Sequence, residues 1–226
     1  MTRLLITRHG ETQWNTEKRM QGRSDSPLTS HGIWQAQQLA RRLKDEKIDV
    51  IYSSPSPRAA RTAEILKGSR GLQVRLLDDI MEINLGDWEG RKFSEVQQLF
   101  PEQSTAFWHA PHLYYREGLE SYHQVQERLV RAIKQIVEAH PDQTVLIVSH
   151  SVATKTLMAY FEGRPLERVW DPPVMEPTAL NIIEATPTGY RIVMHADVSH
   201  TRQPAGEAPA RGGEDARRES NRRAVS

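Results

Sequence analysis

Short runs of apolar, often β-branched residues alternate along this chain with segments whose apolar residues recur at helical spacing. The runs that predict strands are 4–7, 49–53, 73–77, 144–149, 179–184 and 190–195. A segment that predicts a helix follows each of the first four runs, at 33–43, 59–67, 125–136 and 153–161. Strands that alternate with helices are joined by right-handed crossovers. We therefore expect an α/β fold with a mostly parallel sheet and helices on both faces, in three α/β/α layers.

Residues 203–226 differ in composition from the rest of the chain. They contain no aromatic residue and one large aliphatic side chain, Val225, among mixed charges. Such a composition cannot bury enough apolar surface to offset the entropy of ordering. We expect one folded domain over 1–202 and a disordered tail over 203–226, to which we assign no function.

Charge and hydropathy exclude several classes of protein. The chain of 226 residues has 30 Lys and Arg against 29 Asp and Glu, which leaves little excess charge to neutralise a nucleic acid. No apolar run approaches the roughly 18 residues of a membrane span, and the N-terminus lacks the apolar region of a signal peptide. These features predict a cytoplasmic protein with neither a nucleic-acid nor a membrane partner. Cys is absent, which removes disulfides and thiolate catalysis.

Cationic side chains follow three of the predicted strands. Arg8 and His9 follow the first, Arg58 begins the helix after the second, and His150 follows the most apolar strand. Because the carboxyl ends of parallel strands meet at one edge of a sheet, these groups should converge there. Their mutual repulsion requires an anionic partner. Arg matches the oxygens of phosphate, and Gly10 would let the backbone approach it closely.

Without Cys, a Walker-type glycine loop or an Asp-rich metal cluster, His becomes the candidate nucleophile. The leaving oxygen also needs a proton. Glu82, Asp87 and Glu89 compete for that role, and Glu82 lies closest to a strand end. Asp87 and Glu89 flank Trp88 in a glycine-containing turn and are expected to make local hydrogen bonds. No His pair has metal-ligand spacing on a predicted helix face, so neither a metal nor another cofactor is predicted.

Four blocks in order resemble the histidine phosphatase superfamily, the phosphoglycerate-mutase-like enzymes. They are LITRHGET at 5–12 with Asn15, SSPSPRAARTA at 53–63, Glu82, and VLIVSHS at 145–151. The stretches WHAPHLYY at 108–115 and DVSH at 197–200 are similar to the broad-specificity bacterial phosphatases of that superfamily. The resemblance implies a phosphoglycerate-mutase-like fold and a phosphomonoester hydrolase of broad specificity, working through a phosphohistidine.

The resemblance also implies a role for individual residues. His9 would carry the phosphoryl group, Glu82 would protonate the leaving group and then activate water, and the phosphoryl oxygens would be held by Arg8, Arg58 and His150. The substrate side would be lined by Gly10, Asn15, Gln21, Gly22 and Ser151. Arg58 matches the motif through Ala59, Thr62 and Ala63, which leaves Arg61 as an exposed helix residue.

Two positions depart from the family pattern. Ser151 stands where the family usually has Gly after the second His, so a Cβ and a hydroxyl enter a place where bare backbone is common. Leu119 precedes Glu120 and Ser121 where the family often has Gly-Glu-Ser. We expect the phosphate contacts and the loop before the long helix to differ slightly, and catalysis to survive.

Residues 91–119, the cover insertion, are expected to lie over the crevice. They are rich in aromatic residues, among them Trp108 and Tyr115, which we expect to line the substrate side, and they contain no adjacent Arg pair for a second anionic group. Trp108 is also the aromatic residue most expected to reach the core. An aromatic cover favours phosphomonoesters with apolar or varied bodies.

Several alternatives remain open on the sequence alone. They are a cofactor-dependent phosphoglycerate mutase, an alpha-ribazole phosphatase, a phosphohistidine phosphatase acting on proteins, and a module that binds phosphate without catalysis. The full set of His9, Arg58, Glu82 and His150 favours an enzyme, because a binding module needs neither nucleophile nor acid. The expected partner is a small phosphomonoester.

Overall fold

A computed structural model describes residues 1–202 of the chain, and the predicted tail at 203–226 lies outside the described residues. The strands are β1 (Thr2–Arg8), β2 (Val50–Ser53), β3 (Val74–Leu76), β4 (Thr144–Ser149), β5 (Leu180–Thr186) and β6 (Gly189–Asp197). The α-helices are α1 (Gln13–Thr16), α2 (Ser30–Arg42), α3 (Pro57–Lys67), α4 (Phe93–Leu99), α5 (Pro101–His109), α6 (Tyr122–Ala139) and α7 (Ser151–Glu162). Short 3-10 turns are η1 (Asp78–Ile80), η2 (Gly86–Trp88), η3 (Pro111–Leu113), η4 (Leu166–Arg168) and η5 (Ser199–Thr201).

One six-stranded sheet forms the centre of the molecule, in the order β3-β2-β4-β1-β5-β6. The pairs β2 with β3, β2 with β4 and β1 with β4 are parallel, whereas β5 is antiparallel to both β1 and β6. The predicted mostly parallel α/β fold is therefore confirmed. The parallel strands bring the carboxyl ends of β1, β2 and β4 to one edge, as the position of the candidate site requires.

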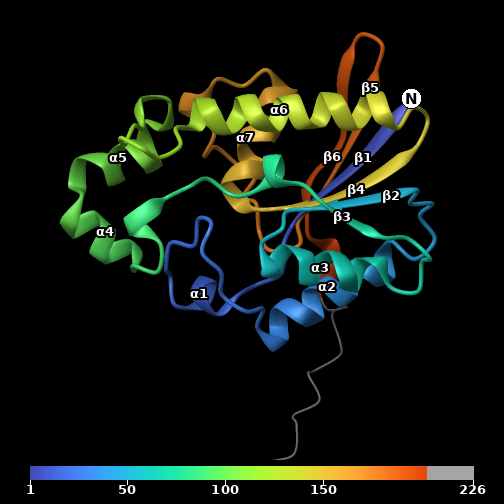
Figure 1. Cartoon of the computed structure of the whole chain (residues 1–226), viewed down its shortest axis with the longest axis horizontal. Helices are drawn as coiled ribbons and strands as arrows, with labels where there is room; N and C mark the ends of the chain where they lie inside the picture. The colour runs from blue at the N-terminus through green and yellow to red at the C-terminus, as the bar shows by residue number, and fades with distance from the viewer. Residues whose placement is uncertain (203–226) are drawn as a thin grey trace, which may run out of the picture.

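The sheet separates two apolar cores, with α6 and α7 over one face and α2 and α3 over the other (Figure 1). Alternate residues of a strand point to opposite faces. In β1, Leu4 and Ile6 belong to the core under α6 and α7, and Leu5 belongs to the other. β4 repeats the alternation, with Ile147 on the first face and Leu146 on the second. This two-sided burial explains why the central strands read as continuous apolar runs.

The helix boundaries extend beyond the apolar patterns that predicted them. α3 begins at Pro57, whose fixed φ and missing N–H suit the first turn of a helix. α7 begins at Ser151, directly after His150 as its N-cap residue. Both extensions bring site residues onto the first turn of a helix, where their position is fixed by the helix itself.

The cover insertion forms α4, α5 and η3, which lie beyond the carboxyl ends of the parallel strands (Figure 1). Phe107 anchors it in the core, where its ring packs against Trp88, Tyr114 and Tyr122. None of the helices described within 1–202 is long and apolar enough to span a bilayer.

Candidate active site

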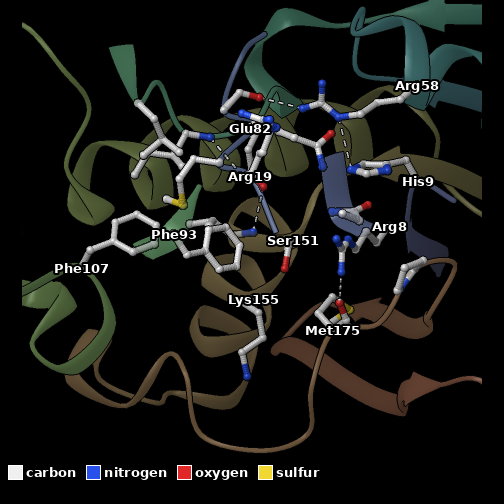
Figure 2. A pocket seen from close by; sticks show the side chains of 18 of the residues that line it. Arg8, His9, Arg19, Arg58, Glu82, Phe93, Phe107, Ser151, Lys155 and Met175 are labelled. Carbon is white, nitrogen blue, oxygen red and sulfur yellow. Dashed lines mark hydrogen bonds between the residues drawn. The ribbon is translucent and has the colours of Figure 1, made fainter. Parts of the chain in front are cut away.

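A cavity of about 520 Å³ opens at the carboxyl edge of the sheet, under the cover insertion (Figure 2). Its inner end is polar and includes Arg8, His9, Arg58 and Glu82. Further out the wall is mostly apolar and is formed by Met20, Ile83, Leu85, Phe93, Phe107, Trp108, Val152, Trp170, Val174, Met175 and Pro177. A small polar group therefore fits the inner end, and a larger apolar body fits the outer part.

His9 lies just past the end of β1 and is 3% exposed. Its Nδ1 lies 2.7 Å from the carbonyl oxygen of Gly10, which can only accept. Nδ1 therefore carries the ring proton in the neutral imidazole, and the lone pair is on Nε2. Nε2 accepts a hydrogen bond of 3.3 Å from Nε of Arg58. The ring thus holds its nucleophilic nitrogen at the cationic end of the cavity.

The environment favours the neutral form of both site histidines. Burial, then the charges of Arg58 and Arg8, lower the pKa of His9 well below its ordinary value. Burial, Arg58 and the neighbouring His9 lower the pKa of His150 in the same way. A neutral His9 keeps the lone pair that nucleophilic attack requires.

Arg58 joins the nucleophile to a loop at residues 22–25. It is 1% exposed, and its Nη2 donates to the carbonyl of Gly22 at 2.7 Å. Its Nη1 donates to the carbonyl of Ser24 at 2.6 Å and to the carboxylate of Asp25 at 3.1 Å. Burial lowers the pKa of Arg58, and the charges of Glu82 and Asp25 oppose that shift. These three acceptors therefore fix the guanidinium beside His9.

Arg8 contributes a second guanidinium at the inner end of the cavity. Its Nη1 donates to the carbonyl of Met175 at 2.8 Å (Figure 2). Its Nε is buried and has no hydrogen-bond partner within the described residues. Burial lowers the pKa of Arg8 to about 10, with Glu82 opposing and Arg58 adding to the shift, so the group remains charged at neutral pH. Nε is thus a donor available to an anion.

His150 packs against His9, with ring centroids 5.3 Å apart in an edge-to-face arrangement. Its Nε2 lies 2.7 Å from Oγ of Ser54, which follows β2. Its Nδ1 is buried without a hydrogen-bond partner among residues 1–202. His150 is fully buried and is not among the residues that line the cavity, so the structure places it beside His9 and not in the cavity wall.

Glu82 is 6% exposed and its carboxylate is held at the N-terminus of α7. It accepts hydrogen bonds from the backbone N–H groups of Val152 at 3.0 Å, Ala153 at 2.9 Å and Ile83 at 3.1 Å. These donors fix a carboxyl group in the cavity wall. Neither of the competing carboxylates, Asp87 and Glu89, lines the cavity.

Glu89 accepts from the backbone N–H groups of Arg23 and Ser24 and from that of Leu85. Asp87 pairs with Arg116 at 2.7 Å. The expectation of local turn hydrogen bonds holds only for the bond from Leu85 to Glu89, because the other partners of the two carboxylates lie on segments distant in sequence. Glu89 also leaves no room for a Cβ at Gly22, whose φ of +54° favours glycine.

Five other predicted substrate-side residues line the cavity. Asn15, Gln21, Gly22, Ser151 and Trp108 are all in its wall. Oε1 of Gln21 is buried and without a partner in the described part of the chain. Trp108 is half-buried and packs on Trp170 at 4.8 Å between ring centroids. The expectation that Trp108 is the core residue of the cover was wrong, because its neighbour Phe107 takes that place.

Two predicted substrate-side residues lie elsewhere. Tyr115 is 70% exposed, because it follows η3 in an irregular segment that turns away from the cavity. Gly10 serves the nucleophile instead of the substrate, since its carbonyl accepts from His9 and its N–H donates to Thr62. A Cβ at Gly10 would lie 2.5 Å from the carbonyl oxygen of Gly32, so α2 is the close backbone neighbour that requires glycine.

Sequence reasoning missed the residues that hold the inner end in place. Asp25 accepts from Arg58, and Glu89 accepts from the backbone of the loop at 22–25. Ser54 contacts His150, and Thr62 bridges the N–H of Gly10 and the carbonyl of Arg58. Ser54 and Thr62 stand inside the second motif block, which was a usable signal. Among residues 1–202, no group of three or more His, Asp or Glu side chains is placed to hold a metal ion.

A family model described as the histidine phosphatase superfamily (branch 1) matches residues 4–198. Phosphoserine phosphatase 1 of Hydrogenobacter thermophilus is 35% identical over 170 residues, which are 75% of this chain and 81% of that protein. Phosphoglycerate mutase-like protein 4 of Arabidopsis thaliana is 34% identical over 168 residues, 73% of this chain and 72% of that protein. The structure of YhfR from Bacillus stearothermophilus superposes with a TM-score of 0.87 at 45% identity, covering 88% of this chain and 99% of that one.

Proposed function

The chain belongs to the histidine phosphatase superfamily, and from this premise we propose that it hydrolyses small phosphomonoesters through a phosphohistidine on His9. The observation that carries the proposal is the orientation of His9, whose Nδ1 faces the Gly10 carbonyl and whose Nε2 faces Arg58. This orientation supports Nε2 as the attacking atom. We further propose that the cover insertion shapes the substrate side of the cavity.

In the first step Nε2 attacks phosphorus, a P–N bond forms, and the bond from phosphorus to the ester oxygen breaks. We propose that Arg8 and Arg58, which line the cavity beside His9, together with His150, which packs against His9, hold the three remaining oxygens as they gain charge, since fixed donors of this kind stabilise such a transition state. Glu82 gives its proton to the departing oxygen. The alcohol then leaves through the outer part of the cavity.

In the second step a water molecule attacks the phosphohistidine. Glu82, now a carboxylate, takes a proton from that water while the P–N bond breaks, and the electron pair returns to Nε2 of His9. Phosphate leaves and Glu82 is again protonated. Each chemical role has a side chain to perform it, so the proposed mechanism includes no metal ion or cofactor.

The outer wall of the cavity supports broad specificity for the part of the substrate that carries the phosphate. Its aromatic and aliphatic side chains make apolar contacts, which do not require hydrogen-bonding groups at fixed positions on the substrate. The cations Arg19 and Lys155 are in this wall, but both donate to main-chain carbonyls: Arg19 to Gly90 at 2.7 Å, and Lys155 to Asp171 and to Pro173 at 3.1 Å. This arrangement favours substrates with one phosphate and a varied, largely uncharged body.

A panel of phosphomonoesters tests the proposal in the presence of a chelator. We expect phosphate release from several aryl, alkyl and sugar phosphates at rates that excess chelator leaves unchanged. His9→Ala is the control for contaminating activity. Activity that needs an added metal ion, or that is confined to a single ester, would contradict the proposal.

A further inference from the structure

Glu82 lies on irregular backbone. The 3-10 turn η1 ends at Ile80, and the next short turn, η2, begins at Gly86, so Glu82 belongs to no regular helix or strand. A group that transfers a proton must be held within a few tenths of an ångström of its productive position. The backbone at 79–84 therefore needs support from elsewhere in the fold.

That support comes from Arg128, a residue in the middle of α6 that is 8% exposed. Its Nη1 donates to the carbonyls of Asp79 at 2.9 Å and Met81 at 2.8 Å, and its Nη2 donates to that of Glu82 at 3.1 Å. The remaining two N–H groups bind the carboxylate of Glu120 at 2.7 and 3.1 Å. All five N–H groups of the guanidinium are thus used, three of them on the segment that carries Glu82.

Glu120 extends the same network. Its Oε2 accepts from the backbone N–H of Asn84 at 2.9 Å and lies 3.3 Å from Nη2 of Arg23. Burial alone would raise the pKa of Glu120, but Arg128, the amide of Asn84 and Arg23 together lower it below its ordinary value. The carboxylate is therefore charged at neutral pH and holds both Arg128 and the far end of the segment.

We propose that Arg128 and Glu120 form a positioning pair that sets the place of the Glu82 carboxyl group, and so controls proton transfer to the leaving oxygen. The proposal rests on the proposed function, in which Glu82 is the general acid. Neither residue lines the cavity. The pair acts through the backbone of 79–84, while the N-terminus of α7 holds the carboxyl group itself.

Leaving-group dependence separates this role from a purely structural one. A displaced acid slows esters of poor leaving groups much more than esters of good ones, because only the former need the proton. A general loss of folded protein slows both equally. The substrates are 2-phenylethyl phosphate and 4-nitrophenyl phosphate, which have similar bodies, and kcat/KM is measured because it covers the steps up to formation of the phosphohistidine.

Arg128→Lys keeps the charge but loses the planar fork. We expect it to lower kcat/KM for 2-phenylethyl phosphate about tenfold more than for 4-nitrophenyl phosphate, a part of the 10² or more that a general acid contributes. Glu120→Gln should give a smaller contrast in the same direction. Arg131→Gln is the matched control, since Arg131 is one turn further along α6, is exposed, and donates to the side chain of Asp79 at 3.2 Å and not to the backbone of 79–84 in the described structure.

Glu82→Gln calibrates the experiment. If it shows no contrast between the two esters, the acid assignment in the proposed function fails. If Glu82→Gln shows the contrast while the folded Arg128→Lys and Glu120→Gln enzymes lose equal factors on both esters, the positioning role is overturned. Should Arg128→Lys not fold, Glu120→Gln alone decides the question, because it retains side-chain volume and an acceptor oxygen.

Discussion

Nε2 of His9 lies 3.3 Å from Nε of Arg58, and this hydrogen bond connects the candidate nucleophile to the most buried cation of the site. The bond occupies the lone pair that would attack phosphorus. A phosphoryl group entering the cavity offers Arg58 a charged acceptor in place of a neutral nitrogen. In the proposed mechanism, binding of the anion would therefore free the lone pair of Nε2 for attack on phosphorus.

The first prediction follows from that geometry. His9→Ala should abolish turnover, since His9 is the one histidine among the described residues that line the cavity. Quenching the wild-type enzyme with alkali during turnover should trap phosphate on His9 that is stable to base and labile to acid. Recovery of phosphate on another residue, or none at all under rapid quenching, would contradict the assignment.

The second prediction compares two arginines of α3. Arg58→Ala should cost roughly 3 kcal/mol or more of transition-state stabilisation, as for loss of a fixed donor to developing charge. Arg61 is exposed, so Arg61→Ala should leave kcat/KM nearly unchanged. Because Arg58 also holds the loop at 22–25, thermal unfolding of both variants is measured alongside. Similar losses at both positions would show that the wrong arginine was chosen.

The main features of this arrangement could be predicted from sequence. Apolar runs located the parallel strands, and the parallel topology then brought Arg8, His9 and His150 to one edge. Arg58 was identified by its motif, and the packing of α3 on β2 places it beside His9. These predictions succeeded because each depends on a local pattern and one general rule of sheet geometry.

The supporting contacts could not be predicted in the same way. Asp25 reaches Arg58 across 33 positions of sequence, and Arg128 reaches Glu82 across 46. No periodic pattern encodes such contacts, because they depend on how irregular segments pack. The prediction of which aromatic residue of the cover insertion reaches the core was wrong for a related reason. Its short helices α4 and α5 carry little periodicity, so the sequence did not show that Phe107 is fully buried and that Trp108 is only half-buried.

The third prediction concerns pH and stability. Burial and the charge of Arg42 lower the pKa of His200 to about 4, and burial together with nearby cations also lowers the pKa values of His9 and His150 well below their ordinary value. An unfolded chain takes up protons on His at about pH 6.5. As the pH falls from 6.5 towards 4, the unfolded state binds protons that the folded state does not, so the free energy of unfolding decreases. Above pH 7 these groups contribute no pH dependence.

Thermal unfolding between pH 8 and pH 4.5 checks this sign. His200→Gln should reduce the steepness of the acid-side loss, since Gln can keep the hydrogen bond of 3.0 Å to Thr178 without taking up a proton. His31→Gln is the control, because His31 is an exposed residue of α2. An unchanged slope in His200→Gln would refute the prediction for this group.

The fourth prediction separates two aromatic residues of the cover insertion. Trp108 lines the cavity and packs on Phe93 and Trp170, whereas Tyr115 points to solvent. Trp108→Ala should lower kcat/KM for phenyl phosphate about tenfold, or ~1.4 kcal/mol of lost apolar contact, with a smaller loss for glycerol phosphate. Tyr115→Ala should alter neither value. Equal effects of the two substitutions would mean that Trp108 contacts the substrate no more than Tyr115 does.

The last prediction distinguishes a phosphatase from a mutase. A mutase must hold the carboxylate of phosphoglycerate while the phosphoryl group returns to the substrate, whereas the cations in the outer wall, Arg19 and Lys155, already donate to main-chain carbonyls. We therefore expect phosphate to be released from 3-phosphoglycerate more slowly than from phenyl phosphate, with no accumulation of 2-phosphoglycerate. Phosphorus NMR of the reaction, with and without added 2,3-bisphosphoglycerate, follows both products at once. Interconversion faster than phosphate release would replace the phosphatase assignment by a mutase, and would leave the fold and the role of His9 unchanged.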